Sequence, residues 1–295
     1  MSNEVVTLKV CETSIWSNEQ LSLGEGPLTH HLRSSLVWCD INGSAVYERG
    51  FAGDETRKFE LPVLPSAAGI LDEKQVLIAS EIDFRVLDLE SGATETVMEF
   101  PEDRLMRSND GRVHPSGAFW IGTMAKDGNG RPGAIYRFFR GNLSILVEGI
   151  VTPNSICFSS DGTTAYYTDT PSRIIWKVPT DPTTGEIIGE REVHVGLRMD
   201  AEGQPDGSVV DAEGNLWNSR WGGSSLDVYG PHGDLISSYQ LPVEQPTCPA
   251  FIGSELDQIV TTSARVDLKD PKQSDGCVIR IHIPVKGVKE PIVRL

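Results

Sequence analysis

Hydrophobic positions along the chain fall into short runs and not into long amphipathic stretches. The runs VLIAS (76–80), FWIGT (119–123), AYYTD (165–169) and NLWNS (215–219) are rich in β-branched and aromatic residues, which favour strands. No segment of ten or more residues shows the 3.6-residue period of an amphipathic helix. The 29 glycines and 18 prolines are spread along the chain, so turns divide it often. The pattern predicts an all-β protein with many short strands.

The same order of turn, strand, tight turn and strand recurs six times. The steps between successive copies are 42, 42, 45, 52 and 40 residues, and the copies begin at Glu25, Ala67, Asn109, Asn154, Asp206 and Pro246. A small sheet cannot bury both of its faces alone, whereas radial packing of repeated sheets buries the faces and protects the edges. The repeat therefore predicts a six-bladed β-propeller formed by one domain, residues 1–295. A two-sheet sandwich would leave the repeat unexplained.

The turns and the N-terminal segment fit the same architecture. Pro115-Ser116-Gly117 and Ser160-Asp161-Gly162 place glycine where a hairpin needs a positive φ. Asp211 precedes a third turn of this kind, so we expect its replacement by alanine to be tolerated. The run VVTLKV (5–10) is expected to pair with the last blade and close the ring, and a free extension is the alternative.

The net negative charge of the chain indicates which kinds of molecule it can bind. Lys and Arg total 26 against 42 Asp and Glu, which gives a formal net charge of −16. Because nucleic-acid-binding surfaces are basic, we expect small molecules or cations as partners and no nucleic acid. The sequence shows no apolar run of membrane-spanning length and no signal-peptide pattern, so we expect a cytoplasmic protein without a membrane partner. The five cysteines are far apart and odd in number, which indicates free thiols.

One position in each copy precedes the strand that is expected to line the central channel. Oxygen donors occupy this position in four copies, as Glu25, Asn109, Asn154 and Asp206. Two carboxylates and two amides that converge from separate blades would form a hard, oxygen-rich site for a divalent cation. Asp and Asn beside Pro or Gly are also common turn formers. Their shared register in four copies is what favours a metal site.

The motifs around these residues occur in a defined order. They are GEGP (24–27), RSNDG (107–111), GTMA (122–125), PNS (153–155) and PDG (205–207). In this order, and over nearly the whole chain, they resemble the regucalcin/gluconolactonase (senescence marker protein-like) family of metal-dependent sugar lactonases. The resemblance implies a β-propeller hydrolase that acts on a carboxylic ester.

The resemblance also implies a metal centre. Glu25, Asn154 and Asp206 correspond to the metal ligands, and Asp206 corresponds to the proposed general base as well. The implied cofactor is one divalent ion, Ca²⁺, Zn²⁺, Mg²⁺ or Mn²⁺. Such an ion polarises a lactone carbonyl and acidifies water, so a ring ester can open without a serine or cysteine nucleophile. The absence of a G-x-S-x-G motif from the sequence agrees with this chemistry.

Three further residues are implied to bind the substrate. Arg107 and Asn109 correspond to substrate-contacting residues, and Asp127 in GTMAKD falls where the family places an acidic one. The expected reaction is hydrolysis of an aldonic or aldaric sugar lactone to the open acid. Two alternatives stay open, a metal-dependent phosphotriesterase or arylesterase of the same fold and a non-enzymatic calcium-binding protein, because propellers support many functions.

Overall fold

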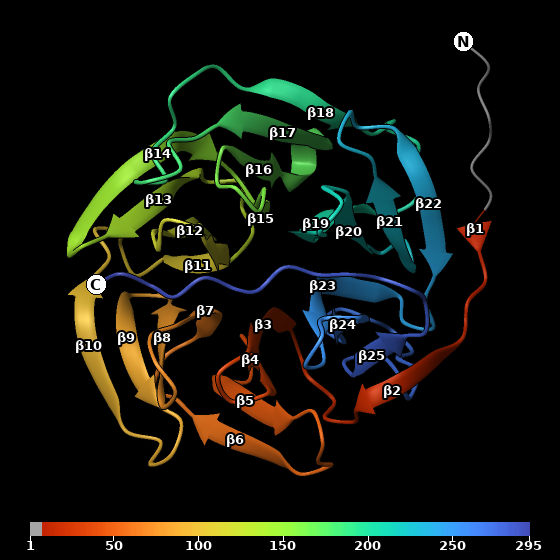
Figure 1. The fold of residues 1–295 in the computed structure, drawn as a ribbon, viewed down its shortest axis with the longest axis horizontal. Coiled ribbons are helices and arrows are strands. Elements are labelled where there is room, and N and C mark those ends of the chain that lie inside the picture. The colour runs from red at the N-terminus through yellow and green to blue at the C-terminus, as the bar shows by residue number, and fades with distance from the viewer. Residues whose placement is uncertain (1–7) are drawn as a thin grey trace.

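The computed structural model describes residues 8–295, which form six sheets arranged around a central axis (Figure 1). In four of the sheets the strands follow one another in chain order from the centre of the ring to its rim, and in the other two a strand from the N-terminal part of the chain is added at the rim. Within residues 8–295 the one helical element is the short 3₁₀ turn η1 (Thr170–Ser172). The predicted all-β, six-bladed propeller is confirmed.

The blades are named one to six in chain order from Gly24, and their strands are as follows. Blade one has β3 (Gly24–His30), β4 (Ser35–Asp40), β5 (Ala45–Gly50) and β6 (Thr56–Glu60); blade two has β7 (Pro65–Ile70), β8 (Gln75–Ser80), β9 (Asp83–Asp88) and β10 (Thr94–Glu99). Blade three has β11 (Met106–Val113), β12 (Phe119–Ala125), β13 (Gly133–Phe139) and β14 (Asn142–Ile150); blade four has β15 (Pro153–Phe158), β16 (Thr164–Asp169), β17 (Ile174–Pro179) and β18 (Glu192–Gly196). Blade five has β19 (Gln204–Val210), β20 (Leu216–Trp221), β21 (Ser225–Tyr229), β22 (Leu235–Gln240) and β1 (Leu8–Lys9); blade six has β23 (Gln245–Ile252), β24 (Gln258–Ala264), β25 (Val278–Ile281) and β2 (Thr13–Ser17).

Burial falls from the centre of the ring to its rim. The inner strands β3, β15 and β23 are buried at every position, whereas most of β10 is exposed. Aromatic side chains fill the spaces between neighbouring blades: the Phe84 ring lies 5.4 Å from that of Phe119, and the Trp217 ring lies 6.2 Å from that of Phe251. The continuous apolar runs of the sequence therefore become strands that are covered on both faces by adjacent blades.

The ring closes differently from the sequence prediction. The strand that completes blade six is β2, which pairs antiparallel with β25. Of the run expected to close the ring, residues 8 and 9 form β1, which pairs in parallel with β22 of blade five, and residues 5–7 lie outside the described part of the chain. Closure thus uses the segment TSIWS, whose Trp16 packs edge-on against Trp38 of blade one. This aromatic contact gives TSIWS more buried surface than the exposed residues of β1 provide.

The C-terminal segment crosses one face of the ring near its axis (Figure 1). Its Lys286 carbonyl accepts a hydrogen bond from the Ala212 amide of blade five, and the amide of Val293 donates to the Ile70 carbonyl of blade two. Ile70 and Ala212 lie at or just beyond the ends of inner strands. The segment therefore covers the end of the central channel at which the inner strands finish, and leaves their starting ends free to build a site.

The structure agrees with the sequence prediction for the turn glycines and differs from it at Asp211. Gly117 and Gly162 have φ values of 90° and 69°, as the hairpin turns require. Asp211 is buried, however, and its carboxylate accepts hydrogen bonds from the amides of Glu213 and Asn215 and from the Trp217 indole. The structure therefore argues against the expectation that Asp211→Ala is tolerated, because the change would leave the buried Trp217 indole without its acceptor. Within residues 8–295 we find no helical segment with the length and hydrophobicity of a membrane span.

Candidate active site

A cavity of about 340 Å³ lies at the starting ends of the inner strands. It is lined by Glu25 of blade one, Arg107 and Asn109 of blade three, Asn154 of blade four and Asp206 of blade five. Five of the six residues that the sequence singles out therefore lie together. Blades two and six contribute none of these five.

A break in strand register shapes this end of every blade. In each inner strand the pairing with the second strand skips at one place, for example between Glu25 and Leu28. Glu25 and Asn154 are the last paired residues before the break, whereas Asn109 and Asp206 lie one residue further, inside it. The four donors thus occupy two adjacent positions and not the single register that the sequence suggested. A bulge re-aims neighbouring side chains, which explains how both positions face one cavity.

The residue after each ligand candidate in blades one and four has a left-handed backbone. Gly26 has φ +54°, and a Cβ at this position would collide with the Ser66 carbonyl of blade two. Only glycine fits here, which accounts for the GEGP motif. Ser155 has φ +56°, and its hydroxyl donates to the Asp206 carbonyl over 2.6 Å. The turns that aim Glu25 and Asn154 are therefore locked by contacts with the following blade.

Four side chains that line the cavity form a hydrogen-bonded row. The Arg107 guanidinium donates to Asn109 Oδ1 over 2.7 Å, and Asn109 Nδ2 donates to Asn154 Oδ1 over 3.0 Å. Asn154 Nδ2 in turn donates to Thr170 Oγ1 over 2.9 Å. Both amides therefore have their oxygen and nitrogen atoms assigned by their partners, and the Asn154 oxygen keeps one lone pair for a further contact.

The site concentrates negative charge in a buried place. Burial, and next the charge of Asp110, raise the pKa of Glu25, while burial and the charge of Glu25 raise the pKa of Asp206. Burial also raises the pKa of Asp110 to about 6. Burial lowers the pKa of Arg107 to about 10, so this side chain stays protonated at neutral pH. The charge of Arg107 acts on Glu25 and Asp206, and that of Arg112 acts on Asp110. Burial outweighs both, so a further positive charge at the cavity would stabilise the ionised forms of Glu25 and Asp206.

The donor set fits a hard divalent cation. Glu25 and Asp206 provide carboxylate oxygens and Asn154 an amide oxygen, which are the ligand types that Ca²⁺ and Mg²⁺ take. Within residues 8–295 no cluster of three or more His, Cys, Asp or Glu side chains is placed to hold a metal. A cation at this cavity would therefore depend on the amide and on water as well as on the two carboxylates.

Asp127 does not join the other candidates. Its side chain is exposed in the turn after β12, where the carboxylate accepts hydrogen bonds from the backbone and side chain of Asn129. Lys126, its neighbour, lines the cavity and forms an ion pair with Glu81 of the turn between β8 and β9. The expectation for Asp127 therefore differs from the structure, which places a basic side chain at the cavity.

Some cavity residues had no signal in the sequence. Gln204 and Trp221 line it as a cross-strand pair of β19 and β20, and Asp267 lines it from the segment after β24. All three lie outside the repeated position, so the repeat could not identify them. Trp221 provides an apolar wall and Asp267 a carboxylate at the cavity.

Comparison with known proteins agrees with this architecture and gives the family. The model of the family described as "SMP-30/Gluconolactonase/LRE-like region" matches residues 23–265. A Rhizobium meliloti protein described as a candidate sugar lactone lactonase is 37% identical, over 92% of this chain and 94% of its own length. L-arabinolactonase from Azospirillum brasilense is 33% identical, over 90% of this chain and 88% of its own length. Lactonases are carboxylic ester hydrolases, which agrees with the predicted enzyme class.

A solved structure is similar over nearly all of both chains. Regucalcin from Agrobacterium tumefaciens, described as a calcium-binding protein, superposes with a TM-score of 0.95 at 37% identity. The match covers 99% of this chain and 100% of the other. The resemblance drawn from the ordered motifs is thus confirmed, and the chain belongs to the SMP-30/gluconolactonase/LRE-like family.

Proposed function

We propose that this protein is a divalent-metal-dependent lactonase that hydrolyses an aldonic or aldaric sugar lactone to the open acid. The observation that supports the proposal most strongly is the convergence of Glu25, Asn154 and Asp206 in one cavity beside Arg107. The names of the relatives, sugar lactone lactonase and L-arabinolactonase, support the substrate class. The polar side chains of the cavity suit a hydroxylated ring better than an aryl ester.

The proposed metal ligands are Glu25, Asn154 and Asp206. A bound Ca²⁺, Zn²⁺, Mg²⁺ or Mn²⁺ would polarise the lactone carbonyl and make an adjacent water more acidic. Arg107 would donate hydrogen bonds to substrate oxygens, and Asn109 holds this guanidinium in place through its Oδ1. The chain's own contribution is thus to hold the ring ester in a fixed orientation, which accounts for a large part of a catalysed rate.

Asp206 is the proposed proton acceptor. It is buried in the cavity with a raised pKa, and proton acceptance by a positioned carboxylate is a general-base role. Water adds to the carbonyl carbon, the ring C–O bond breaks, and the leaving oxygen takes a proton to become a hydroxyl group. The open acid then ionises, so one proton is released per turnover near neutral pH.

A substrate panel tests the proposal. The metal-loaded protein is assayed with aldonic lactones, aldaric lactones, an aryl ester and a phosphotriester, and metal binding is measured on the same preparation. Hydrolysis of a sugar lactone well above the aryl ester supports the proposal. Activity on the phosphotriester alone would assign the site to the second enzyme class, and metal binding without any hydrolysis would indicate a calcium-binding protein.

A further inference from the structure

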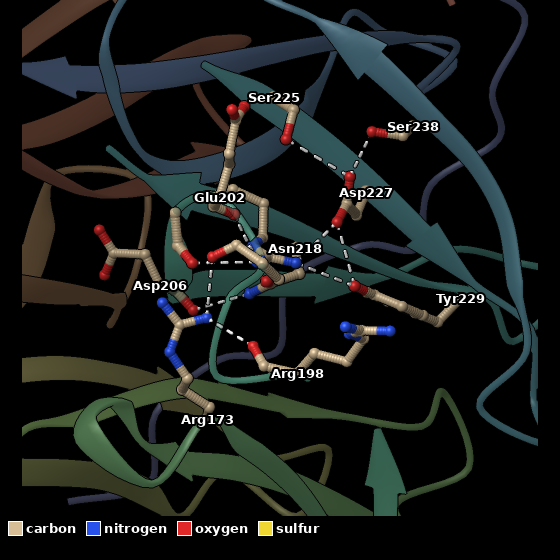
Figure 2. Close-up of polar contacts among 12 residues, drawn as sticks. Arg173, Arg198, Glu202, Asp206, Asn218, Ser225, Asp227, Tyr229 and Ser238 are labelled. Carbon is tan, nitrogen blue, oxygen red and sulfur yellow. Dashed lines mark hydrogen bonds and ion pairs between the residues drawn. The ribbon is translucent and has the colours of Figure 1, made fainter. Parts of the chain in front are cut away.

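The loop that leads into Asp206 is held by two arginine side chains from adjacent blades. This loop, residues 197–203, connects β18 of blade four to β19 of blade five. From the blade-four side, Arg173 Nη1 donates to the carbonyls of Arg198 and Ala201 over 3.0 and 3.1 Å (Figure 2). The Leu197 amide donates back to the Arg173 carbonyl over 2.9 Å. Arg173 therefore holds the first part of the loop through both its backbone and its side chain.

Arg220 of β20 holds the second part of the same loop. Its Nη2 donates to the carbonyls of Glu202 and Gly203 over 2.8 and 3.0 Å. Bonds from a charged guanidinium to carbonyl oxygens are stronger than neutral ones. Carbonyl groups of the loop that have no strand partner thus accept hydrogen bonds from two guanidinium groups, one on each side of the loop.

A buried acidic group fixes the position of Arg220. The other terminal nitrogen of Arg220 donates to Asp227 over 2.9 Å, and both residues are buried. Asp227 also accepts hydrogen bonds from the Tyr229 hydroxyl over 3.0 Å and from the Ser238 hydroxyl (Figure 2). Because the carboxylate is held from several sides, the guanidinium has little freedom to leave the loop.

The held loop ends directly at the cavity. Gly203 has φ +66° and packs so tightly that a Cβ would lie 2.7 Å from the Cα of Gly223. Gln204 follows and lines the cavity, and Pro205 pairs with Arg220 in the strand register. Asp206 is the next residue. Two residues, Gln204 and Pro205, therefore separate the last clamped carbonyl, that of Gly203, from the residue proposed to bind metal and to accept a proton.

The backbone on the other side of Asp206 is fixed by separate contacts. The Asp206 carbonyl accepts hydrogen bonds from the Asn218 side chain over 2.9 Å and from the Ser155 hydroxyl over 2.6 Å. These contacts hold the Asp206 carbonyl, and Thr170 Oγ1 donates to the Pro205 carbonyl over 3.0 Å. The backbone before Pro205 continues directly from the held loop, so the seating of the loop bears on the direction in which the Asp206 side chain leaves the backbone.

We propose that Arg173 and Arg220, together called the arginine clamp, are positioning residues that set the orientation of Asp206 and Gln204 in the cavity. The consequence for metal binding and turnover rests on the proposed function, whereas the seating of the loop does not. Lysine can keep an ion pair with Asp227, but a single ammonium lacks the planar fork that spans the carboxylate and two carbonyls at once. Arg220→Lys therefore loosens the loop while it keeps the buried charge paired.

Blade two offers a matched control. Arg85 is buried and forms an ion pair with Asp83, and its Nε lies 2.9 Å from Asp83 Oδ1. Its side-chain hydrogen bonds within the described residues go to Asp83 alone. Arg85→Lys thus perturbs a similar buried pair in a blade that provides no ligand candidate.

The experiment compares wild type, Arg220→Lys and Arg85→Lys by amide hydrogen exchange, Mn²⁺ titration and steady-state kinetics on the best lactone of the panel. In Arg220→Lys we expect exchange in residues 197–206 to be about 10- to 100-fold faster, as loss of one charged hydrogen bond implies. Mn²⁺ affinity and kcat should each fall about tenfold, with KM nearly unchanged. Arg85→Lys should lower the melting temperature comparably and leave loop exchange, Mn²⁺ affinity and kcat within about twofold of wild type.

Each result decides a separate part of the proposal. Unchanged exchange in Arg220→Lys would overturn the clamp, and faster exchange with wild-type Mn²⁺ affinity and kcat would overturn its link to Asp206. If Arg220→Lys fails to fold, Arg173→Lys at the partly exposed end of the clamp replaces it, with the same expectations. A wild-type protein that neither binds Mn²⁺ nor hydrolyses lactones would contradict the proposed function, while loop exchange would still test the clamp.

Discussion

Blades five and two contain the same stabilising feature but differ at the channel. Each buries an aspartate of its third strand against an arginine, Asp227 with Arg220 in blade five and Asp83 with Arg85 in blade two. In blade five the arginine also reaches the loop before the inner strand, and Asp206 occupies the bulge. In blade two the bulge residue is Ser66, which bonds to Ser108 of blade three.

The difference separates what builds a blade from what builds a site. A buried aspartate–arginine pair occurs in a blade with a ligand candidate and in one without, so the pair alone carries no chemistry. The residue in the bulge and the second set of contacts made by the arginine are specific to blade five. Function in a repeated fold therefore lies in departures from the repeat.

Substitution of the residue in the bulge by alanine should give the largest difference in activity between the two blades. Asp206→Ala removes a proposed ligand and proton acceptor, so we expect kcat/KM to fall by about 100- to 10,000-fold and metal binding to weaken. Ser66→Ala in blade two removes one neutral hydrogen bond, and we expect activity within a few-fold of wild type. Calorimetric titration and steady-state kinetics measure both effects. Equal metal affinity in wild type and Asp206→Ala would contradict the ligand assignment.

Removal of the buried carboxylate of Asp83 in blade two should lower the free energy of unfolding and leave the catalytic rate unchanged. Asp83 also accepts hydrogen bonds from Ser80 and Thr96, and Asp83→Ala would leave Arg85 buried without its carboxylate. Breaking such a pair costs about 3 to 5 kcal/mol of unfolding free energy. Denaturant unfolding measures this loss, and kcat/KM of the folded protein should match wild type. A large fall in kcat/KM would show that blade two is coupled to the cavity.

Arg107→Ala should lower activity and leave stability nearly unchanged, whereas a change at Arg85 should lower stability and leave activity nearly unchanged. The Arg107 guanidinium faces the cavity, and its loss should lower kcat/KM by about 10- to 1,000-fold through a missing charged hydrogen bond and poorer orientation. The melting temperature and the metal affinity should change little. Thermal melting and metal titration check these two controls, and a loss of metal binding would place Arg107 in the metal centre instead of at the substrate.

The smallest effect concerns β1, the extra strand that blade five has and blade two lacks. Deletion of residues 1–10 removes the two-residue pairing with β22 and the Lys9–Ser237 hydrogen bond. We expect a cost of about 1 kcal/mol or less, seen as a melting shift of about 2 to 4 °C or less. A deletion through Ser17 also removes β2, exposes the edge of β25, and should destabilise the ring severely. Equal melting temperatures for the two deletions would contradict closure by β2.

The repeat made the fold predictable because its signals are local. Turn glycines such as Gly117 and Gly162 and the short apolar runs identify each hairpin without knowledge of distant contacts. The same repeat singled out Glu25, Asn109, Asn154 and Asp206, and all four line the cavity although they occupy two adjacent positions of the repeat. Sequence alone could therefore find the oxygen donors that the inner strands contribute to the cavity, but not the rest of its lining.

Features that depend on backbone geometry could not be predicted from the sequence. The bulge that shifts Asp206 by one residue relative to Glu25 leaves no residue-type signature. The clamp residues Arg173 and Arg220 bond to carbonyl groups, which every residue has. Asp127 was favoured by resemblance, but the turn after β12 directs it to solvent.

The most direct test of the central claim measures proton release from a sugar lactone as a function of metal occupancy. The protein is first freed of metal with excess chelator, and Ca²⁺, Zn²⁺, Mg²⁺ and Mn²⁺ are then titrated singly while hydrolysis is followed near neutral pH. We predict that the metal-free protein is inactive, that at least one ion restores the rate, and that the restored rate follows the occupancy of a single site. Full activity in protein shown to be metal-free, or no hydrolysis of any aldonic or aldaric lactone by metal-saturated protein, would contradict the claim.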